Sequence, residues 1–567
     1  MIVDVVVDNG KGAPVTGLKA PDFEILEDGK PQTVNFFEEH ASRTLPASAV
    51  QALPPMPPNV FTNVPAAPQT EAVNVLLIDT LNTPQPEFSY ARNQVMDYLN
   101  HVQPGTRIAV FTLGEKLNFV QGFTADPAAL AAAVKDRKKG ANPSFSQPLV
   151  SRSDVSEVNG SVDFLKQNGP GGAVGGLASS FAADEMLLAF DSYKAFAERS
   201  RTLMTLEALD YLARYLSEVP GRKNLIWFSG TFPVVIFPKY DQMAQFEQSE
   251  VPPSRIRATA DRLTAARIAV YPVSSRGVML ETTISADSRQ AGNDPGNGSH
   301  MATNDPMATY AAESSERAGV IIAMNQIAHD TGGKAIYNTN DLSTATARAI
   351  DDGARYYTLS YTPTNKKMDG NYRSVEVKVN GAKYKLSYRH GYNATDPNKE
   401  PQVKDTDPLR SLLRPGLPAA TELLYGLRAV AATPQPAPDA KRAGKNDLLN
   451  APVTRYSLDF MIRWTDVKLT EAPDGTHTGK ILVELTAFDS NGKPVNWEGV
   501  TQQMNLTPQV YASIQQSGLP AHLDIDLPNA PVRLVTGVYD WSTGKTGTLE
   551  IPIIPGAAPA TPHAGAR

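Results

Sequence analysis

The strongest constraint on the fold is a series of short, almost uninterrupted apolar segments between residues 73 and 346. They cover residues 73–78, 107–113, 224–228 and 268–273, and sequences with helical periodicity separate them. A strand that is apolar on both faces is typical of a parallel sheet covered by helices on both sides. The alternation therefore predicts a doubly wound, mostly parallel α/β sheet. Ligands of such sheets bind at the carboxyl ends of the strands, which directs attention to the residues after 78, 113 and 228.

Helices are expected where apolar residues recur at spacings of three and four. They cover residues 87–101, 127–138, 182–218, 255–266, 318–331 and 342–352. Short strands are expected at 117–121 and 334–337. The segment near 140–180 is rich in Gly, Ser and Asn, and the segment near 283–312 is polar, so we expect both to be long insertions.

The regions on either side of this unit have the period-two pattern of β-strands. Residues 1–40 and 354–393 contain too few strands to be stable separately, so we expect them to pair in one small β-domain that contains the α/β unit (71–353) as an insertion or flanks it. Residues 451–555 predict a C-terminal β-sandwich. The expected connections are a Pro- and Ala-rich linker at 41–70, a linker at 394–450 with a helix at 420–431, and a disordered tail at 556–567.

The composition excludes several kinds of partner and site. A net charge of −6 over 567 residues provides no broad basic face, so nucleic acid is not expected as a partner. The lack of cysteine excludes disulfides, thiolate metal sites and cysteine nucleophiles. No segment has the roughly 20 apolar residues that span a bilayer. The sequence begins in a strand-like run without a signal-peptide pattern, so either the protein is cytosolic or a targeting segment precedes it.

The first apolar segment ends in Asp79-Thr80-Leu81-Asn82-Thr83, which resembles the start of the metal-ion-dependent adhesion site of von Willebrand factor A (VWA) domains. In that family the strand ends in Asp-x-Ser-x-Ser, and these side chains hold Mg²⁺ together with a Thr and an Asp from other loops. Asp79 matches the first position and Thr83 the third, but Leu81 replaces the middle hydroxyl. Ser229 stands where the family has the later Asp. The Thr of the middle loop is expected within 140–180 and is not assigned.

The resemblance narrows to the VWFA-related proteins of the acidobacterial type. It is carried by residues 14–18 (PVTGL), 22–32 (DFEILEDGKPQ), 220–224 (PGRKN) and 357–361 (YTLSY), and it covers about residues 3–393. It implies a VWA-type, Rossmann-like sheet. Because members of the family generally look exported, it also implies an extracellular or periplasmic location in the bacterial cell envelope. The function of the family is poorly defined, so the resemblance implies little about mechanism.

These features favour a non-enzymatic, protein-binding or adhesion-type protein with a degenerate metal site and a protein or other macromolecule as its partner. The alternative is a cation-dependent receptor, with Mg²⁺ or Ca²⁺ held by Asp79, Asn82, Thr83 and Ser229. Without a metal, Asp79 accepts bonds from backbone N–H groups at the next helix and Ser229 is a turn residue. A hydrolase is a third hypothesis, but the sequence has no His-Glu-x-x-His, phosphate-loop or Gly-x-Ser-x-Gly motif.

Overall fold

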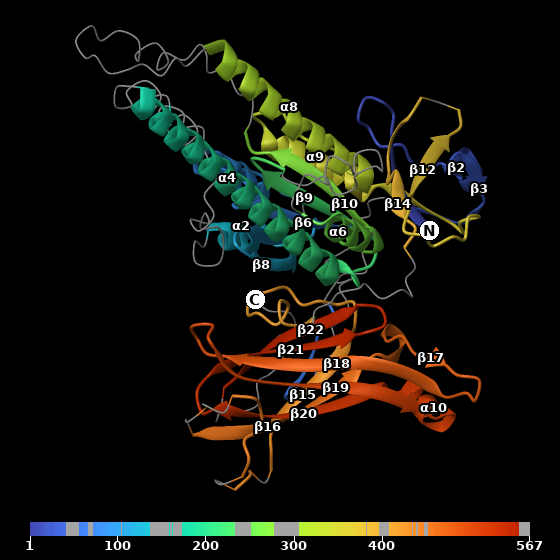
Figure 1. Cartoon of the computed structure of the whole chain (residues 1–567). Helices are drawn as coiled ribbons and strands as arrows, with labels where there is room; N and C mark the ends of the chain where they lie inside the picture. Colours follow the sequence, from blue (N-terminus) through green and yellow to red (C-terminus); the bar gives the residue numbers. More distant parts are fainter. Residues whose placement is uncertain are drawn as a thin grey trace.

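The computed structural model describes residues 1–40, 56–65, 72–103, 105–135, 158, 161–162, 173–232, 251–276, 306–381, 383–395, 407–433, 435–437, 440–446, 449 and 452–554. They form three units (Figure 1): an α/β unit in the upper part of the view, a small β-domain with the N-terminus to its right, and a C-terminal β-domain below. Most of the two predicted insertions and the whole predicted tail lie outside the described residues.

A five-stranded sheet in the order β10-β9-β6-β7-β8 forms the centre of the α/β unit. Its strands are β6 (Ala72–Asp79), β7 (Ile108–Leu113), β8 (Leu117–Thr124), β9 (Arg222–Ser229) and β10 (Ile268–Ser274). Pairing is parallel except at the edge, where β8 runs antiparallel to β7. All residues of β7, β9 and β10 are buried, so the mostly parallel, two-sided sheet predicted from the apolar segments is confirmed. The strand predicted at 334–337 is reduced to one bridge, between Ile336 and Val273.

Helices cover both faces of this sheet. The first face carries α1 (Gln85–Asn100), α2 (Pro127–Lys135) and α9 (Leu342–Ala354). The second face carries α4 (Ala173–Leu216), α6 (Pro253–Ala265) and α8 (Pro306–Thr331). Two separate apolar cores result, because side chains alternate along a strand: Leu76 packs with the first set of helices and Leu77 with the second.

Two helices are longer than the sequence predicted. α4 begins at Ala173, within the segment near 140–180, and α8 begins at Pro306, within the segment near 283–312. The addition to α8 contains three alanines, which favour helix, whereas the addition to α4 contains two alanines and two glycines. Neither addition has apolar residues at a clear helical spacing, so the pattern missed both.

The strands before and after the α/β unit pair with each other in the β-domain, as expected. One sheet has the order β13-β1-β11-β4 and the other β14-β12-β2-β3, with an apolar core that includes Val5, Ile25 and Val377 between them. The strands are β1 (Ile2–Asp8), β2 (Phe23–Glu27), β3 (Lys30–Gln32), β4 (Val34–His40), β11 (Tyr356–Tyr361), β12 (Tyr372–Val379), β13 (Lys385–Ser387) and β14 (Gly391–Asn393).

The C-terminal domain contains two antiparallel sheets around a second large core. One sheet contains β5 (Val60–Thr62), β15 (Tyr425–Ala431), β16 (Val453–Ile462) and β20 (Leu519–Pro528). The other contains β17 (Thr470–Glu471), β18 (His477–Phe488), β19 (Pro494–Leu506), β21 (Val532–Asp540) and β22 (Thr546–Ile553), and α10 (Pro508–Ser517) follows β19. A buried ion pair between Arg214 of α4 and Glu422 joins this domain to the α/β unit.

Two predictions about the connecting segments are wrong. Residues 420–431 were expected to be a helix in a linker, but 425–431 form strand β15 between β5 and β16. Tyr425, Leu427 and Ala429 are buried at every second position, as in a strand. The apolar residues of this short segment fit a helix and a strand equally, and tertiary packing decides between them. The expected linker at 41–70 contributes β5 to the same sheet, because three residues are too few to give a recognisable period.

One carboxylate at the contact between the β-domain and the α/β unit is unusually basic. Asp261 of α6 accepts a hydrogen bond from Nδ2 of Asn393 in β14 at 2.9 Å. Burial raises the pKa of Asp261 to about 6, although bonds from Asn393 and Thr395 oppose that rise. The contact is therefore sensitive to proton binding between the ordinary pKa of an aspartate and neutrality.

Replacing Asp261 with asparagine is expected to stabilise the protein by about 2 kcal/mol at pH ~8 and to have little effect at pH ~4. A pKa that folding raises contributes stability that is complete below the unfolded value, about 3.9, and is lost as the pH rises through about 6. Asparagine carries no charge to desolvate and keeps an oxygen for Asn393. Urea unfolding at both pH values measures the effect, with exposed Asp191→Asn as the control. An equal change at both pH values contradicts the prediction.

Candidate functional site

The structure brings the four predicted site residues together at the carboxyl edge of the sheet. Asp79 ends β6 and Ser229 ends β9, and these strands are parallel neighbours. The loop after β6 carries Asn82 and Thr83 over the same edge, where the Thr83 hydroxyl oxygen accepts a 2.9 Å bond from the backbone N–H of Gly230. The four side chains therefore lie together because neighbouring parallel strands end at the same edge, while their role as metal ligands stays a prediction.

The Asp79 carboxylate is the centre of the cluster and is 1 % exposed. Oδ1 accepts a bond from the backbone N–H of Asn82 at 2.9 Å. Oδ2 accepts three bonds, from Nδ2 of Asn82 at 2.9 Å, Nε1 of Trp227 at 3.0 Å and Oγ of Ser229 at 2.9 Å. A carboxylate has about four lone-pair positions, so these donors occupy its accepting capacity.

Two members of this network were missed in the sequence. Trp227 has the apolar character of the core strand around it, and only the fold shows that its indole N–H points to Asp79. Thr205 of α4 is more than a hundred positions away, and its hydroxyl oxygen accepts a 3.0 Å bond from Nδ2 of Asn82. It supplies a hydroxyl from α4, beyond the segment 140–180 where the middle-loop Thr was expected. No local motif marks either residue.

Leu81 does not take part in the polar network. It is 2 % exposed and packs in the apolar core with Leu77, Leu113 and Leu117. Its side chain anchors the loop after β6 through burial, where the VWA motif has a hydroxyl. At this position, apolar packing by Leu81 therefore takes the place of the hydroxyl in the motif.

The residues present do not fit a standard Mg²⁺ or Ca²⁺ shell. Such ions take about six or more oxygen ligands, and the one carboxylate among the four predicted ligands, Asp79, is already engaged by donors. Burial raises the pKa of Asp79 because it penalises the charged form, while bonds from Asn82, Trp227 and Ser229 oppose the rise. Oδ1 of Asn82 is a buried oxygen without a hydrogen-bond partner among the described residues. One free amide oxygen is too few to hold the ion.

Within the part of the chain that the structure describes, no three His, Asp or Glu side chains gather closely enough to hold a metal ion. None of the described helices combines the length and apolar character needed to cross a bilayer.

Comparisons with known proteins add only distant likenesses. No protein-family description and no curated protein matches the sequence. Among solved structures, an aerotolerance-related membrane protein from Bacteroides fragilis is similar at 11 % identity and a TM-score of 0.24, over 50 % of this chain and 98 % of that one. A von Willebrand factor type A protein from Catenulispora acidiphila matches at 13 % identity and a TM-score of 0.15, over 57 % and 66 %. The pilus adhesin SpaC from Lactobacillus rhamnosus GG matches at 9 % identity and 0.24, over 94 % and 58 %.

Proposed function

We propose that this chain is a non-enzymatic, protein-binding protein of adhesion type in the bacterial cell envelope or outside the cell. Its VWA-like α/β unit serves as a scaffold with a degenerate metal-ion-dependent adhesion site, and Asp79 stabilises the loop after β6. The observation that carries the proposal is a long part of α4 that extends beyond the sheet and exposes large apolar side chains. The expectation of an acidobacterial VWFA-related protein agrees with this role but rests on sequence resemblance.

The contact of α4 with the Asp79 network marks the point where the helix passes beyond the carboxyl edge of the sheet. Thr205 bonds Asn82 at the carboxyl edge of the sheet, and the helix then runs down the sheet to Leu216, before β9 begins at Arg222. The part of α4 before Thr205 therefore points away from the sheet. At about 1.5 Å per residue this part is roughly 48 Å long. Figure 1 shows α4 and α8 extending together beyond the sheet on that side.

The extended part of α4 exposes large apolar side chains. Phe181, Leu188 and Phe196 are 72 %, 68 % and 59 % exposed, and Tyr193 is also exposed. On α8, Ile322 is exposed as well. Spacings of seven and eight residues place Phe181, Leu188 and Phe196 toward one side of the helix. Exposed Glu185 and Ser192 lie between them on the same side, so the three large apolar side chains project singly from a helix that can contact a partner protein.

Replacing Phe181, Leu188 and Phe196 together with serine is expected to reduce binding of the natural partner by about tenfold or more, because large apolar side chains supply most of the energy of such contacts. The full chain, immobilised and incubated with the cell-envelope fraction of its source organism, captures the partner, and mass spectrometry quantifies it. The folded core is expected to keep its melting temperature, because the three side chains are exposed.

A matched control carries three serines in the C-terminal domain, at the exposed positions Met461, Trp497 and Val500. It is expected to capture the same partner as the unmodified chain. A partner lost equally from both variants, or lost from neither, contradicts the assignment of α4 as the binding surface. Self-association that disappears only in the α4 variant identifies a second copy of this chain as the partner.

A further inference from the structure

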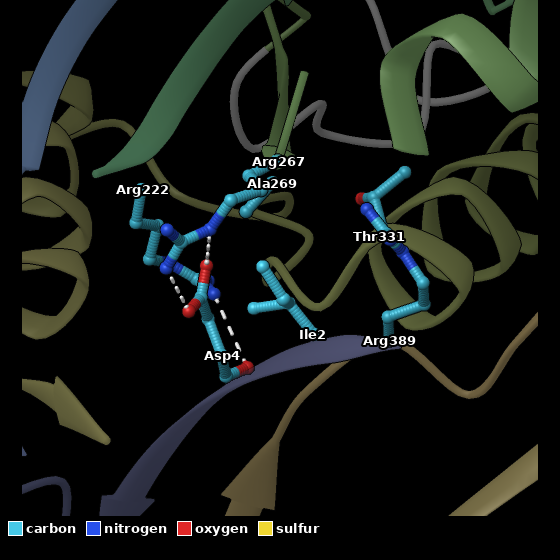
Figure 2. A pocket seen from close by; sticks show the side chains of 7 residues that line it. All are labelled: Ile2, Asp4, Arg222, Arg267, Ala269, Thr331 and Arg389. Carbon is cyan, nitrogen blue, oxygen red and sulfur yellow. Dashed lines mark hydrogen bonds and ion pairs between the residues drawn. The ribbon is translucent and has the colours of Figure 1, made fainter. Parts of the chain in front are cut away.

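A small pocket lies where the β-domain meets the amino edge of the α/β sheet (Figure 2). Its enclosed volume is only about 10 Å³, within about 260 Å³ of atom-free space that includes open solvent at its mouth. The residues that line it are Ile2, Asp4, Arg222, Arg267, Ala269, Thr331 and Arg389. Both units contribute, since Asp4 belongs to β1 and Arg222 begins β9.

Positive charge exceeds negative charge in the lining. Arg267 binds Asp4 through two nitrogens, one of them Nε at 3.0 Å from Oδ2, so this pair is neutral. Arg222 donates to neutral groups, with bonds to the backbone oxygen of Gly332 at 2.6 Å and to Oδ1 of Asn224 at 3.2 Å. Asp4 is the one carboxylate among the lining residues, which include three arginines.

Arg389 contributes a buried positive charge to the pocket. It is 8 % exposed, and its Nε has no hydrogen-bond partner among the described residues. Figure 2 shows its side chain reaching into the pocket toward Thr331, apart from the Asp4 pair. The Thr331 hydroxyl donates to the backbone oxygen of Ile327 and accepts from the backbone N–H of Val270, and it accepts no bond from Nε of Arg389.

The lowered pKa of Arg389 is consistent with the lack of a hydrogen-bonded anion beside it. Burial lowers the pKa of Arg389 to about 10, Asp4 raises it in part, and Arg222 and Arg267 lower it further. A buried cation without a hydrogen-bonded anion is costly, and buried charges in proteins are normally paired. The positive charge also acts on Lys223 outside the lining, where burial and Arg267 lower the pKa to about 7.

We propose that this pocket binds a small inorganic anion. Arg389, Arg222 and the part of the Arg267 guanidinium that does not bond Asp4 bind this anion. Guanidinium groups bind oxyanions through paired N–H donors and also accept halides as point charges. The enclosed space has room for one water-sized ion such as chloride, and a sulfate or phosphate would extend into the open mouth of the pocket. The bound anion connects the β-domain to the α/β unit, because Arg389 and Arg222 belong to different units.

Thermal unfolding of the full chain at constant ionic strength tests the site. Sodium phosphate, sulfate or chloride replaces sodium gluconate, whose anion is too large for the pocket. We expect saturable stabilisation of the unmodified chain, since a ligand of the folded state alone raises the melting temperature. In Arg389→Gln, the apparent Kd is expected to rise about tenfold or more, because a hydrogen bond to a charged group is lost. Arg428→Gln, on the exposed face of β15, is the control and should behave as the unmodified chain.

A second variant keeps the test decisive if Arg389→Gln does not fold. Ile2 is 44 % exposed and lines the pocket, so Ile2→Glu places a carboxylate at its mouth without disturbing a core. This variant is expected to be more stable than the unmodified chain and insensitive to anions. Stabilisation by phosphate and sulfate alone identifies an oxyanion, and stabilisation by chloride alone a halide. Equal responses of the unmodified chain, Ile2→Glu and Arg428→Gln overturn the proposal.

Discussion

Replacing Asp79 with alanine is expected to lower the free energy of unfolding by about 3–5 kcal/mol. The carboxylate accepts four bonds in a buried network, and its removal leaves the backbone N–H of Asn82 and the indole N–H of Trp227 without an acceptor. Nδ2 of Asn82 keeps its bond to Thr205, and the Ser229 hydroxyl can still donate to the backbone oxygen of Thr231. Each buried donor without a partner costs about 1–3 kcal/mol, and local rearrangement recovers part of the sum. Urea unfolding followed by tryptophan fluorescence measures the loss, since Trp227 lies at the site.

Ser229→Ala is the matched control for this prediction, because it removes one donor and leaves the acceptor in place. Its expected cost is about 1 kcal/mol. Melting temperatures with excess Mg²⁺, Ca²⁺ or EDTA separate the structural role of Asp79 from the cation-dependent alternative. We expect no change with any of the three. A rise with Mg²⁺ or Ca²⁺ in the unmodified chain that is absent from Asp79→Ala supports the cation-dependent receptor and contradicts the degenerate site.

Replacing Asp4 with asparagine is expected to cost a similar amount, about 3–5 kcal/mol, because it removes one partner of a largely buried ion pair. Arg222, Arg267 and Arg389 then face one another with no carboxylate in the pocket lining. Burial favours a raised pKa for Asp4, but the bonds and charge of Arg267 and the charge of Arg222 outweigh it, so the pKa lies below its ordinary value.

The destabilisation caused by Asp4→Asn is expected to decrease as the pH falls. A pKa that folding lowers contributes stability that is present above the unfolded value, about 3.9, and is lost as the pH falls through the folded value. The unmodified chain and Asp4→Asn are therefore expected to converge in stability at acid pH and to differ most near neutrality. Adding Arg389→Gln to Asp4→Asn should recover part of the loss, since it removes one of the repelling charges. A loss that is independent of pH and unaffected by Arg389→Gln contradicts the electrostatic explanation.

The sequence predicted the features that depend on local pattern. Strands such as 224–228 could be recognised because burial on both faces produces an uninterrupted apolar segment. The meeting of Asp79 and Ser229 followed from the geometry of neighbouring parallel strands. In contrast, 425–431 is short and its apolar residues fit a helix and a strand equally well, so only its position between β5 and β16 decides its structure.

The remaining parts of both sites depend on contacts between distant residues. Trp227 and Thr205 join Asp79 and Asn82 from separate elements, and no spacing in the sequence links them. Arg389 lies far from Arg222 and Arg267 in sequence, and its lack of a partner is visible only once the burial of its side chain is known. Such features depend on tertiary packing, which local sequence patterns do not reveal.

The pairing of strands from distant parts of the chain has a consequence for biosynthesis. β4 pairs with β11, and Asn63, next to β5, bonds the backbone oxygen of Leu423, 360 positions later. On the ribosome, the N-terminal strands and β5 must wait without partners until most of the polypeptide has emerged. The α/β unit, whose strands and helices follow one another, is expected to fold first and to hold these strands near their later partners. Truncation between β15 and β16 is therefore expected to leave β5 and β15 as an incomplete sheet exposed to chaperones and proteases.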